Sequence, residues 1–216
     1  MTAEARGCEA GGMRRICVVP VVFASLAACG ADDAPGGVDA PSSPVDAAAD
    51  AQPTPDAPSI DAPPAALTLT STVITEGGVI PDMYSCQGTN VSPPLSWSGG
   101  PSAAGYAVVL TDRSNNLVHS IIWDIPGTVT SLPENVSKVA EPPTPAGSKQ
   151  PPAYDNQTRG YLGPCPGSMH TYEFMVYAVD EHPLTGVTLS SNRTAVRSAL
   201  MANMVATATL TATFTP

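Results

Sequence analysis

The stretch that decides the fold is GYLGPCPGSMHTYEFMVYAVD, residues 160–180. Its first half, up to Gly167, is rich in Gly and Pro, which leaves the backbone little freedom to form a helix or a strand. From His170 on, the residues alternate with a period of two, which puts Tyr172 and Phe174 on the same face as His170. The sequence therefore predicts a stiff loop that delivers an imidazole to the start of a buried strand. The imidazole either belongs to a binding site or simply caps the loop through a carbonyl.

The first 29 residues have the features of a secretory signal. Arg14 and Arg15 precede an apolar run, residues 16–28, that is too short for a permanent membrane span. The run ends in Leu-Ala-Ala-Cys29, which resembles the bacterial lipobox, where the Cys is lipidated. We therefore expect a lipoprotein anchored to a bacterial membrane in the cell envelope, on its periplasmic or surface face. An ordinary signal peptide with an incidental Cys29 is the alternative, and either Met1 or Met13 is the start.

Residues 30–66 have the composition of a linker. They carry seven Asp among Ala, Pro, Gly and Ser, but no Lys, Arg or aromatic residue. Such a segment cannot bury enough apolar surface to offset the entropy of ordering, and repulsion between its like charges keeps it extended. We expect a disordered tether at 30–66, followed by one domain of ordinary size at 67–216.

The charge of the expected domain restricts its partners. From Leu67 on, the chain carries six Lys or Arg and ten Asp or Glu, which leaves a net charge of −4. Because no basic stripe exists, nucleic acid is not an expected partner. An anion would be repelled at long range, so an anion site must act through local donors.

Two of the five cysteines, Cys86 and Cys165, lie in the expected domain. In an exported protein an isolated pair usually forms a disulfide, which we favour here. Two free thiols, or a metal pair completed by histidines, are the alternatives.

Alternating apolar residues and turn signals predict a mainly β fold. We expect strands at 66–71, 95–97, 105–112, 117–125, 170–179 and 205–214, and loops at 79–94 and 126–152. One helix is expected at 192–203, with Ser191 or Asn192 as its N-cap. Many strands with one late helix indicate a β-sandwich. His182 precedes a Pro in a polar loop and is expected to be exposed.

Turn residues 113–116 join two of these strands and bring Asp112 and His119 near each other if the strands pair as a hairpin. Simple alternation puts His119 on one face with Ile121 and Trp123. A carboxylate beside an imidazole orients the ring and raises its pKa. A pair that merely stabilises the turn is the alternative.

Four segments carry a resemblance to a known family. They are IPxxYxCxGxNxSPPLxW at 80–97, the isolated Asp112, His119 at the start of its strand, and GYxGPCP followed by HxYxF at 160–174. Together they resemble the phosphatidylethanolamine-binding protein family, in its bacterial Raf-kinase-inhibitor-like branch, over the whole of 67–216.

The resemblance implies a β-sandwich with a C-terminal helix and, at one end, a small pocket for an anionic group such as a phosphate head group. It implies that the pocket and its rim are formed by Asp112, His119, His170, Tyr172, Gly163 and Pro164. It also favours the Cys86–Cys165 disulfide, because both cysteines lie in blocks that would flank the pocket. A small anion or phospholipid head group is the implied ligand, with another protein as a further partner and no cofactor.

The chain also departs from the family pattern. The family motif Asp-Pro-Asp-x-Pro is reduced to Asp112-Arg113-Ser114, and Thr171 replaces an Arg. Gly167 replaces a Pro, and Asn203 stands where a His is usual. These changes predict a shallower pocket or weaker anion affinity. Arg113 either supplies a replacement positive charge or points to solvent.

We therefore expect an exported binding protein with an anion pocket, which regulates or inhibits another protein, and not an enzyme. The alternative is a metal-dependent hydrolase or lyase in which Asp112, His119 and His170 hold the metal. No nucleophile elbow and no HExxH motif supports that alternative. A plain cell-surface β-sandwich without pocket chemistry is the third hypothesis.

Overall fold

The structure, a computed structural model, describes residues 65–216, so the expected signal segment, Cys29 and the linker up to residue 64 lie outside the described residues. In chain order its elements are β1 (Thr68–Thr70), β2 (Gly78–Val79), the 3-10 helix η1 (Asp82–Tyr84), β3 (Leu95–Ser98), β4 (Gly105–Asp112), β5 (Leu117–Pro126), β6 (Ser131–Leu132), β7 (His170–Val179), α1 (Arg193–Asn203) and β8 (Met204–Phe214). In this part of the chain, no helix is long and apolar enough to cross a bilayer.

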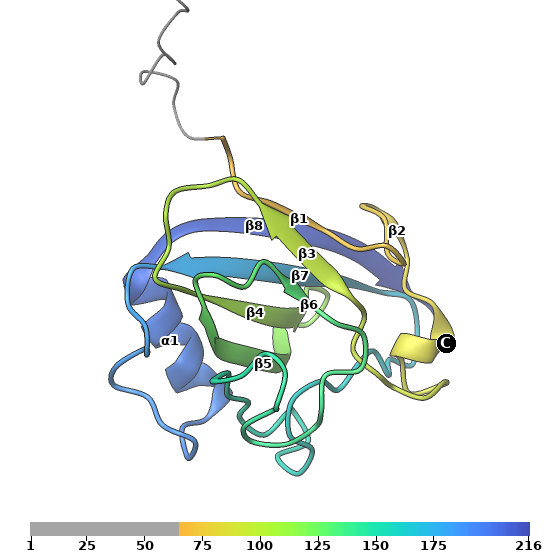
Figure 1. The fold of residues 1–216 in the computed structure, drawn as a ribbon. Coiled ribbons are helices and arrows are strands. Elements are labelled where there is room, and N and C mark those ends of the chain that lie inside the picture. Colours follow the sequence, from red (N-terminus) through yellow and green to blue (C-terminus); the bar gives the residue numbers. More distant parts are fainter. Residues whose placement is uncertain (1–64) are drawn as a thin grey trace, which may run out of the picture. The chain divides into compact units, whose positions relative to one another are not determined.

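Two sheets form the sandwich (Figure 1). The larger has the order β2-β8-β7-β4-β5, and the smaller has the order β1-β3-β6. Aromatic residues fill the space between them, including Trp97 from β3, Tyr106 from β4 and Phe174 from β7. All eight residues of β4 are buried, because the five-stranded sheet is covered on both faces. The mainly β sandwich that the sequence predicts is confirmed.

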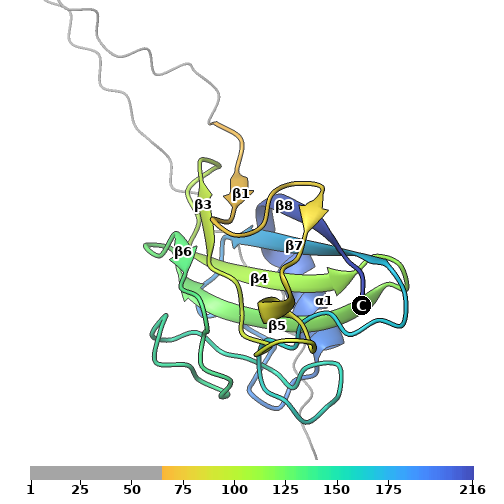
Figure 2. The same cartoon turned by 90° about the vertical axis from the view of Figure 1, so that its right-hand side faces the viewer.

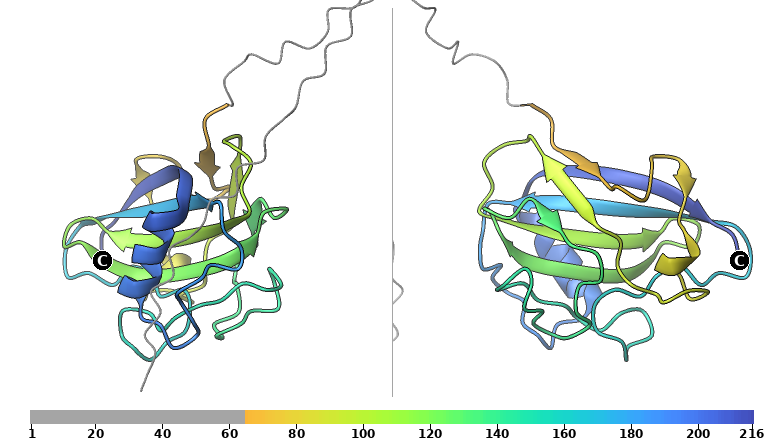
Figure 3. Two further views of the ribbon diagram at one scale, coloured as in Figure 1. Left: turned by 90° about the vertical axis from the view of Figure 1, so that its left-hand side faces the viewer. Right: turned by 45° about the vertical axis from the view of Figure 1, so that its right-hand side comes forward.

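The second face of the five-stranded sheet is covered by α1 (Figure 3, left). Val196 and Leu200 lie one helical turn apart and pack against Ile121 and Trp123 of β5. The helix begins where the sequence predicts, because the Asn192 side chain accepts a hydrogen bond from the Ala195 N–H at 2.9 Å.

Three short elements lie inside, or overlap the start of, the segments expected to be loops. They are β2, η1 and β6. A strand of two residues is too short to show an alternating pattern in the sequence. The two-residue strands β2 and β6 are recognised in the structure because they pair with β8 and β3, respectively. The longer strands agree with the prediction to within two residues at each end.

The face assigned to His119 from simple alternation is wrong. The β4–β5 register skips His119 between two paired neighbours, which makes it the extra residue of a β-bulge. Ile121 and Trp123 point toward α1, as the alternation requires. The His119 ring instead lies edge-on against Tyr172, whose side chain belongs to the core between the sheets. The bulge therefore moves the imidazole to the face that carries Tyr172.

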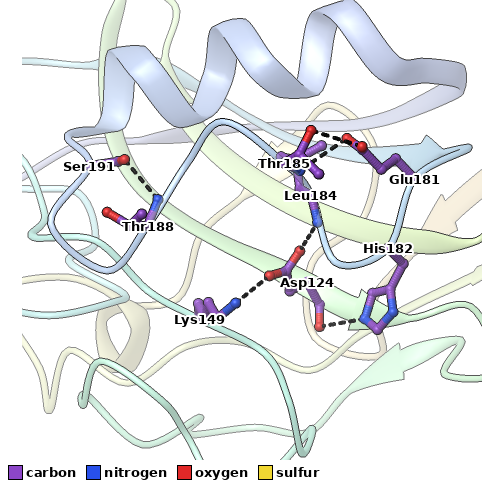
Figure 4. A network of polar contacts seen from close by, with 8 residues as sticks. All are labelled: Asp124, Lys149, Glu181, His182, Leu184, Thr185, Thr188 and Ser191. Atoms are coloured by element: carbon purple, nitrogen blue, oxygen red, sulfur yellow. Dashed lines mark hydrogen bonds and ion pairs between the residues drawn. The ribbon is translucent and has the colours of Figure 1, made fainter.

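A polar network fixes the far end of β5 (Figure 4). Asp124 has a left-handed φ of 55°, and its carboxylate accepts hydrogen bonds from Lys149 Nζ at 2.8 Å and from the Leu184 N–H at 2.7 Å. His182 is exposed, as expected, and its Nε2 lies 3.3 Å from the Asp124 carbonyl. This network ties the loop after β7 to the sheet, at the opposite end from His119.

Candidate functional site

The candidate site lies where β4 ends and where β5 and β7 begin, on the right-hand side of Figure 1. The register pairs Asp112 with Leu117 of β5 on one side and with Tyr172 of β7 on the other. Because these strands are neighbours, residues distant in sequence meet at one edge of the sheet. Asp112, His119, His170 and Tyr172 are brought together in this way.

The closest polar contact of the site joins Asp112 to His170. Asp112 is 2% exposed, and its Oδ2 lies 2.6 Å from His170 Nδ1. A carboxylate only accepts, so Nδ1 carries the hydrogen and Nε2 is the nitrogen left for another partner. The other carboxylate oxygen accepts the Ser114 N–H at 2.9 Å. The side chain of His170 is 23% exposed, which makes it the solvent-facing member of the site.

His119 is buried behind this pair and is 3% exposed. Its Nδ1 lies 3.1 Å from the Leu162 carbonyl oxygen, so this nitrogen carries the hydrogen. The ring centre lies 5.4 Å from that of Tyr172 and 4.4 Å from that of Tyr154. Burial lowers the pKa of His119, although the Leu162 carbonyl and the charge of Asp112 oppose that shift. The sequence-based expectation of a raised pKa from a direct Asp112 partner is therefore wrong for His119.

Tyr172 supplies a hydroxyl to the same cluster and is 1% exposed. Burial, and then the charge of Asp112, raise the pKa of Tyr172 well above its usual range. The hydroxyl therefore keeps its proton at physiological pH and acts as a hydrogen-bond donor.

The loop before β7 is held against the segment that contains η1 (Figure 2). The Gly163 N–H donates to Asn90 Oδ1 at 2.8 Å, and the Cys86 N–H donates to the Pro164 carbonyl at 2.9 Å. The Tyr161 hydroxyl donates to the Tyr84 carbonyl at 2.7 Å. The Gly163 N–H is thus already occupied, so it is not a free donor for an anion.

The predicted disulfide between Cys86 and Cys165 is present, with a Cα–Cα distance of 5.3 Å. It joins the same two segments that the hydrogen bonds connect. Gly163 has no room for a side chain, because a Cβ there would collide with the Tyr84 carbonyl oxygen and the Tyr161 hydroxyl. The position of the loop beside His119 is therefore fixed by covalent, polar and steric constraints together.

Arg113 does not join the cluster. Its guanidinium lies 3.6 Å from Glu173, which occupies the face of β7 opposite to Tyr172. Its side chain is half exposed and lies beside Glu173. Arg113 therefore does not supply the site with the replacement positive charge that the sequence suggested.

The geometry does not support the metal alternative. Asp112 Oδ2 and His170 Nδ1 bond to each other, and His119 Nδ1 faces the Leu162 carbonyl, so these three atoms already have partners other than a metal ion. Within residues 65–216, no group of three His, Cys, Asp or Glu side chains is arranged to hold a metal ion.

A small cavity of about 40 Å³ lies in the interior between the two sheets. Leu110, Ile122 and Phe174 line it, together with Ser120 and Tyr161. None of the four clustered polar side chains reaches it, so we assign it to imperfect core packing rather than to the site.

Sequence reasoning missed two contributors to the site. Asn90 was recognised as part of a motif, but nothing in the sequence indicated that its amide holds the Gly163 N–H. Tyr154 lies in a Pro-rich segment without periodicity, yet its ring covers His119 and its N–H donates to the His119 carbonyl at 3.0 Å. Only long-range packing reveals this contact.

Comparisons with known proteins agree with the fold and with the motifs. A protein of Methanothermobacter thermautotrophicus named UPF0098 is 40% identical over 120 residues, which are 53% of this chain and 77% of that protein. A Mycobacterium tuberculosis protein, LppC, is named as a candidate lipoprotein and is 35% identical over 114 residues. The aligned part spans 51% of this chain and about half, 54%, of LppC.

Among solved structures, Escherichia coli YbcL, described as a member of the mammalian PEBP family, matches with a TM-score of 0.63 and 29% identity. The match covers 70% of this chain and 99% of YbcL. The family model described as phosphatidylethanolamine-binding protein matches residues 70–215. The chain therefore belongs to the phosphatidylethanolamine-binding protein family.

Proposed function

We propose that this chain binds a small anionic group, a phosphate head group or a carboxylate, at the cluster of Asp112, His119, His170 and Tyr172. One observation carries the proposal: the buried Asp112 carboxylate lies 2.6 Å from the partly exposed His170 ring. This contact fixes the ring and leaves Nε2 for a ligand. When His170 is protonated, Asp112 balances its charge, and Nε2–H can donate a charge-assisted hydrogen bond to an anion.

The other two side chains complete the proposed site in different ways. Tyr172 offers a hydroxyl that stays protonated. Neutral His119 keeps its hydrogen on Nδ1 for Leu162, so its Nε2 has only a lone pair. An anion can use that nitrogen only after it gains a proton. Anion binding should therefore take up a proton and strengthen as the pH falls.

The proposal also places this cluster of side chains outside the cytoplasm. The expected lipobox at Cys29 and the name of the LppC relative support an exported, lipid-anchored protein in the cell envelope. An anionic group carried by another protein would bind at the same cluster, which is how a regulatory or inhibitory role would arise. Nothing in the geometry favours an enzyme.

A thermal-shift experiment with phosphate and phosphoethanolamine tests the proposal. We expect both ligands to raise the melting temperature of the wild type, and His119→Ala with His170→Ala to lose that rise. His182→Ala is the matched control, because His182 is exposed and outside the cluster, so it should respond as the wild type does. An unchanged ligand response in the double variant, or stabilisation by Zn²⁺ that a chelator reverses, would contradict the proposal.

A further inference from the structure

A second polar groove lies between the β4–β5 turn and α1, with a volume of about 520 Å³. One face of α1 contributes the guanidinium groups of Arg193 and Arg197 and the hydroxyls of Thr194 and Ser198, and the turn contributes the Asn116 amide. No Asp or Glu lines the groove, and none of the four side chains of the proposed anion site does. The groove is therefore a separate cationic surface, in an expected domain whose net charge is −4.

The charge of Arg197 is not balanced by its surroundings. In the part of the chain that the structure describes, the ion pairs involve Arg113, Lys149 and His170, and no carboxylate lies within ion-pair distance of Arg197. Its Nε is also buried and has no hydrogen-bond partner among the described residues. Because a buried donor without a partner is unfavourable, the guanidinium would be stabilised by an anion in the groove.

Arg193, in contrast, is fixed in place by hydrogen bonds. All of those that it makes to described residues come from Nη1, which donates to the carbonyls of Pro152, at 2.8 Å, and of Ala153, and to Asn156 Oδ1 at 3.5 Å. Its Nε and Nη2 are left for another partner. Burial lowers the pKa of Arg193, and the charge of Asp155 only partly opposes that shift. The positive charge of Arg193 is therefore also incompletely balanced.

The two guanidinium groups are neighbours on the helix surface. Arg193 and Arg197 are four residues apart in α1, and side chains with this spacing lie on the same face. Two like charges at this spacing destabilise a helix, and a group of opposite sign between them would remove that repulsion. A phosphate group suits this position, because guanidinium groups bind its oxygens through pairs of charge-assisted hydrogen bonds. The hydroxyls of Thr194 and Ser198 add neutral donors.

The remaining part of the groove is apolar. Leu117 and Val118 of β5 and Met201 of α1 line it, and Met201 is 53% exposed. The volume of about 520 Å³ lies within the range of about 300–1,000 Å³ that is usual for small-molecule sites. A free phosphate ion would leave the apolar side chains in water, whereas the organic part of a phosphate ester would cover them.

We propose that this groove binds a phosphate ester, with the phosphate group at Arg193 and Arg197 and the organic part against Leu117 and Met201. The groove is then a second ligand site of the chain. This inference does not depend on the proposed anion site at His170, because the two sites share no residue.

A nuclear magnetic resonance titration of the chain with phenyl phosphate and with inorganic phosphate tests this inference. We expect the amide signals of Asn116 and Ser198 and the Nε–Hε signal of Arg197 to shift with one common dissociation constant for each ligand. Phenyl phosphate should bind on the order of tenfold more tightly than inorganic phosphate, because its ring buries apolar surface in the groove.

Three variants make the titration specific to the groove. Arg197→Gln should weaken the binding of phenyl phosphate by about tenfold or more, because hydrogen bonds to a charged group are lost. Lys138→Gln removes a cation that does not line the groove and serves as the matched control, which should bind as the wild type does. His119→Ala with His170→Ala removes the proposed anion site and should leave the shifts at the groove unchanged.

The inference is overturned if Arg197→Gln binds phenyl phosphate as tightly as the wild type does, or if the groove signals no longer respond in the double histidine variant. It is also overturned if phenyl phosphate and inorganic phosphate bind equally tightly, because the groove would then recognise only the anion.

Vesicles that contain phosphatidic acid distinguish two sources of the ester. If the chain sediments with these vesicles and Arg197→Gln weakens that sedimentation, the ester belongs to a lipid. If phenyl phosphate binds but the vesicles do not sediment the chain through Arg197, the ester belongs to a soluble molecule.

Discussion

Asp112 Oδ2 accepts a hydrogen bond from His170 Nδ1 at 2.6 Å, and this contact joins the end of β4 to the start of β7. The carboxylate is buried, whereas the ring reaches solvent. The contact therefore positions an exposed imidazole from a rigid base, which is the arrangement that a small binding site needs.

Replacing Asp112 by Asn removes the charge that holds His170. A hydrogen bond to a charged group contributes about 1.5–3 kcal/mol. Because His170 is partly exposed, we expect Asp112→Asn to lower the free energy of unfolding by only about 1–2 kcal/mol. Urea unfolding measures this loss. Nitrogen-15 spectra of His170 should also show that the ring no longer holds its hydrogen on Nδ1 alone.

Arg113→Gln provides the comparison, because it removes an ion pair with Glu173 whose Arg side chain is half exposed. Such surface pairs contribute about 0–1 kcal/mol. If Arg113→Gln lowered the free energy of unfolding as much as Asp112→Asn, the contact between Asp112 and His170 would contribute no more to stability than a surface ion pair.

His119 should make stability depend on pH. Burial lowers the pKa of its folded-state ring, so as the pH falls below about 6.5 the unfolded chain takes up a proton before the folded protein does. Stability from this group is complete above the unfolded pKa and is lost as the pH falls through the folded pKa. His119→Gln should therefore flatten the decline of the urea midpoint between about pH 7 and pH 5. The exposed His182→Gln should not change it, and equal slopes in all three proteins would refute this account of His119.

Two glycines in one loop provide a direct comparison. A side chain at Gly163 would collide with the Tyr84 carbonyl, whereas a Cβ at Gly167 would meet nothing within 4 Å. We expect Gly163→Ala to displace the loop beside His119, lowering both the melting temperature and the anion response, and Gly167→Ala to behave as the wild type. Comparable melting temperatures for the two variants would show that the loop is not fixed as described.

The disulfide should stabilise the fold substantially. Cys86 and Cys165 are separated by 79 residues, and closing so long a loop contributes about 4 kcal/mol in the chain-entropy model. We expect Cys86→Ser with Cys165→Ser to lose an amount of that order in urea unfolding. Reducing agent should reproduce the loss in the wild type and have no effect on the double variant.

Most of the fold could be predicted from the sequence because the long strands carry clear alternation. β7, for example, places Tyr172, Phe174 and Val176 on the core face, as its pattern predicts. The two-residue strands β2 and β6 escaped prediction, since they depend on partners distant in sequence.

The site was only partly predictable. Motifs identified Asp112, His119 and His170, but register decides which of them touch. A bulge, which leaves no sequence signal here, turns His119 away from Ile121. Asp112 then bonds to His170, which is 58 positions away, rather than to His119 in the adjoining strand. Tyr154 was not identified, because its contact with His119 depends on the path of an irregular loop.

A nuclear magnetic resonance titration of the chain with phosphoethanolamine, following the ring Hε1 signals of all three histidines, tests the central claim most directly. The account predicts that His119 and His170 shift together with one common dissociation constant, while His182 stays unchanged. Shifts of His119 and His170 with different constants, or no shift of either ring at millimolar ligand, would show that the two imidazoles do not share an anion site.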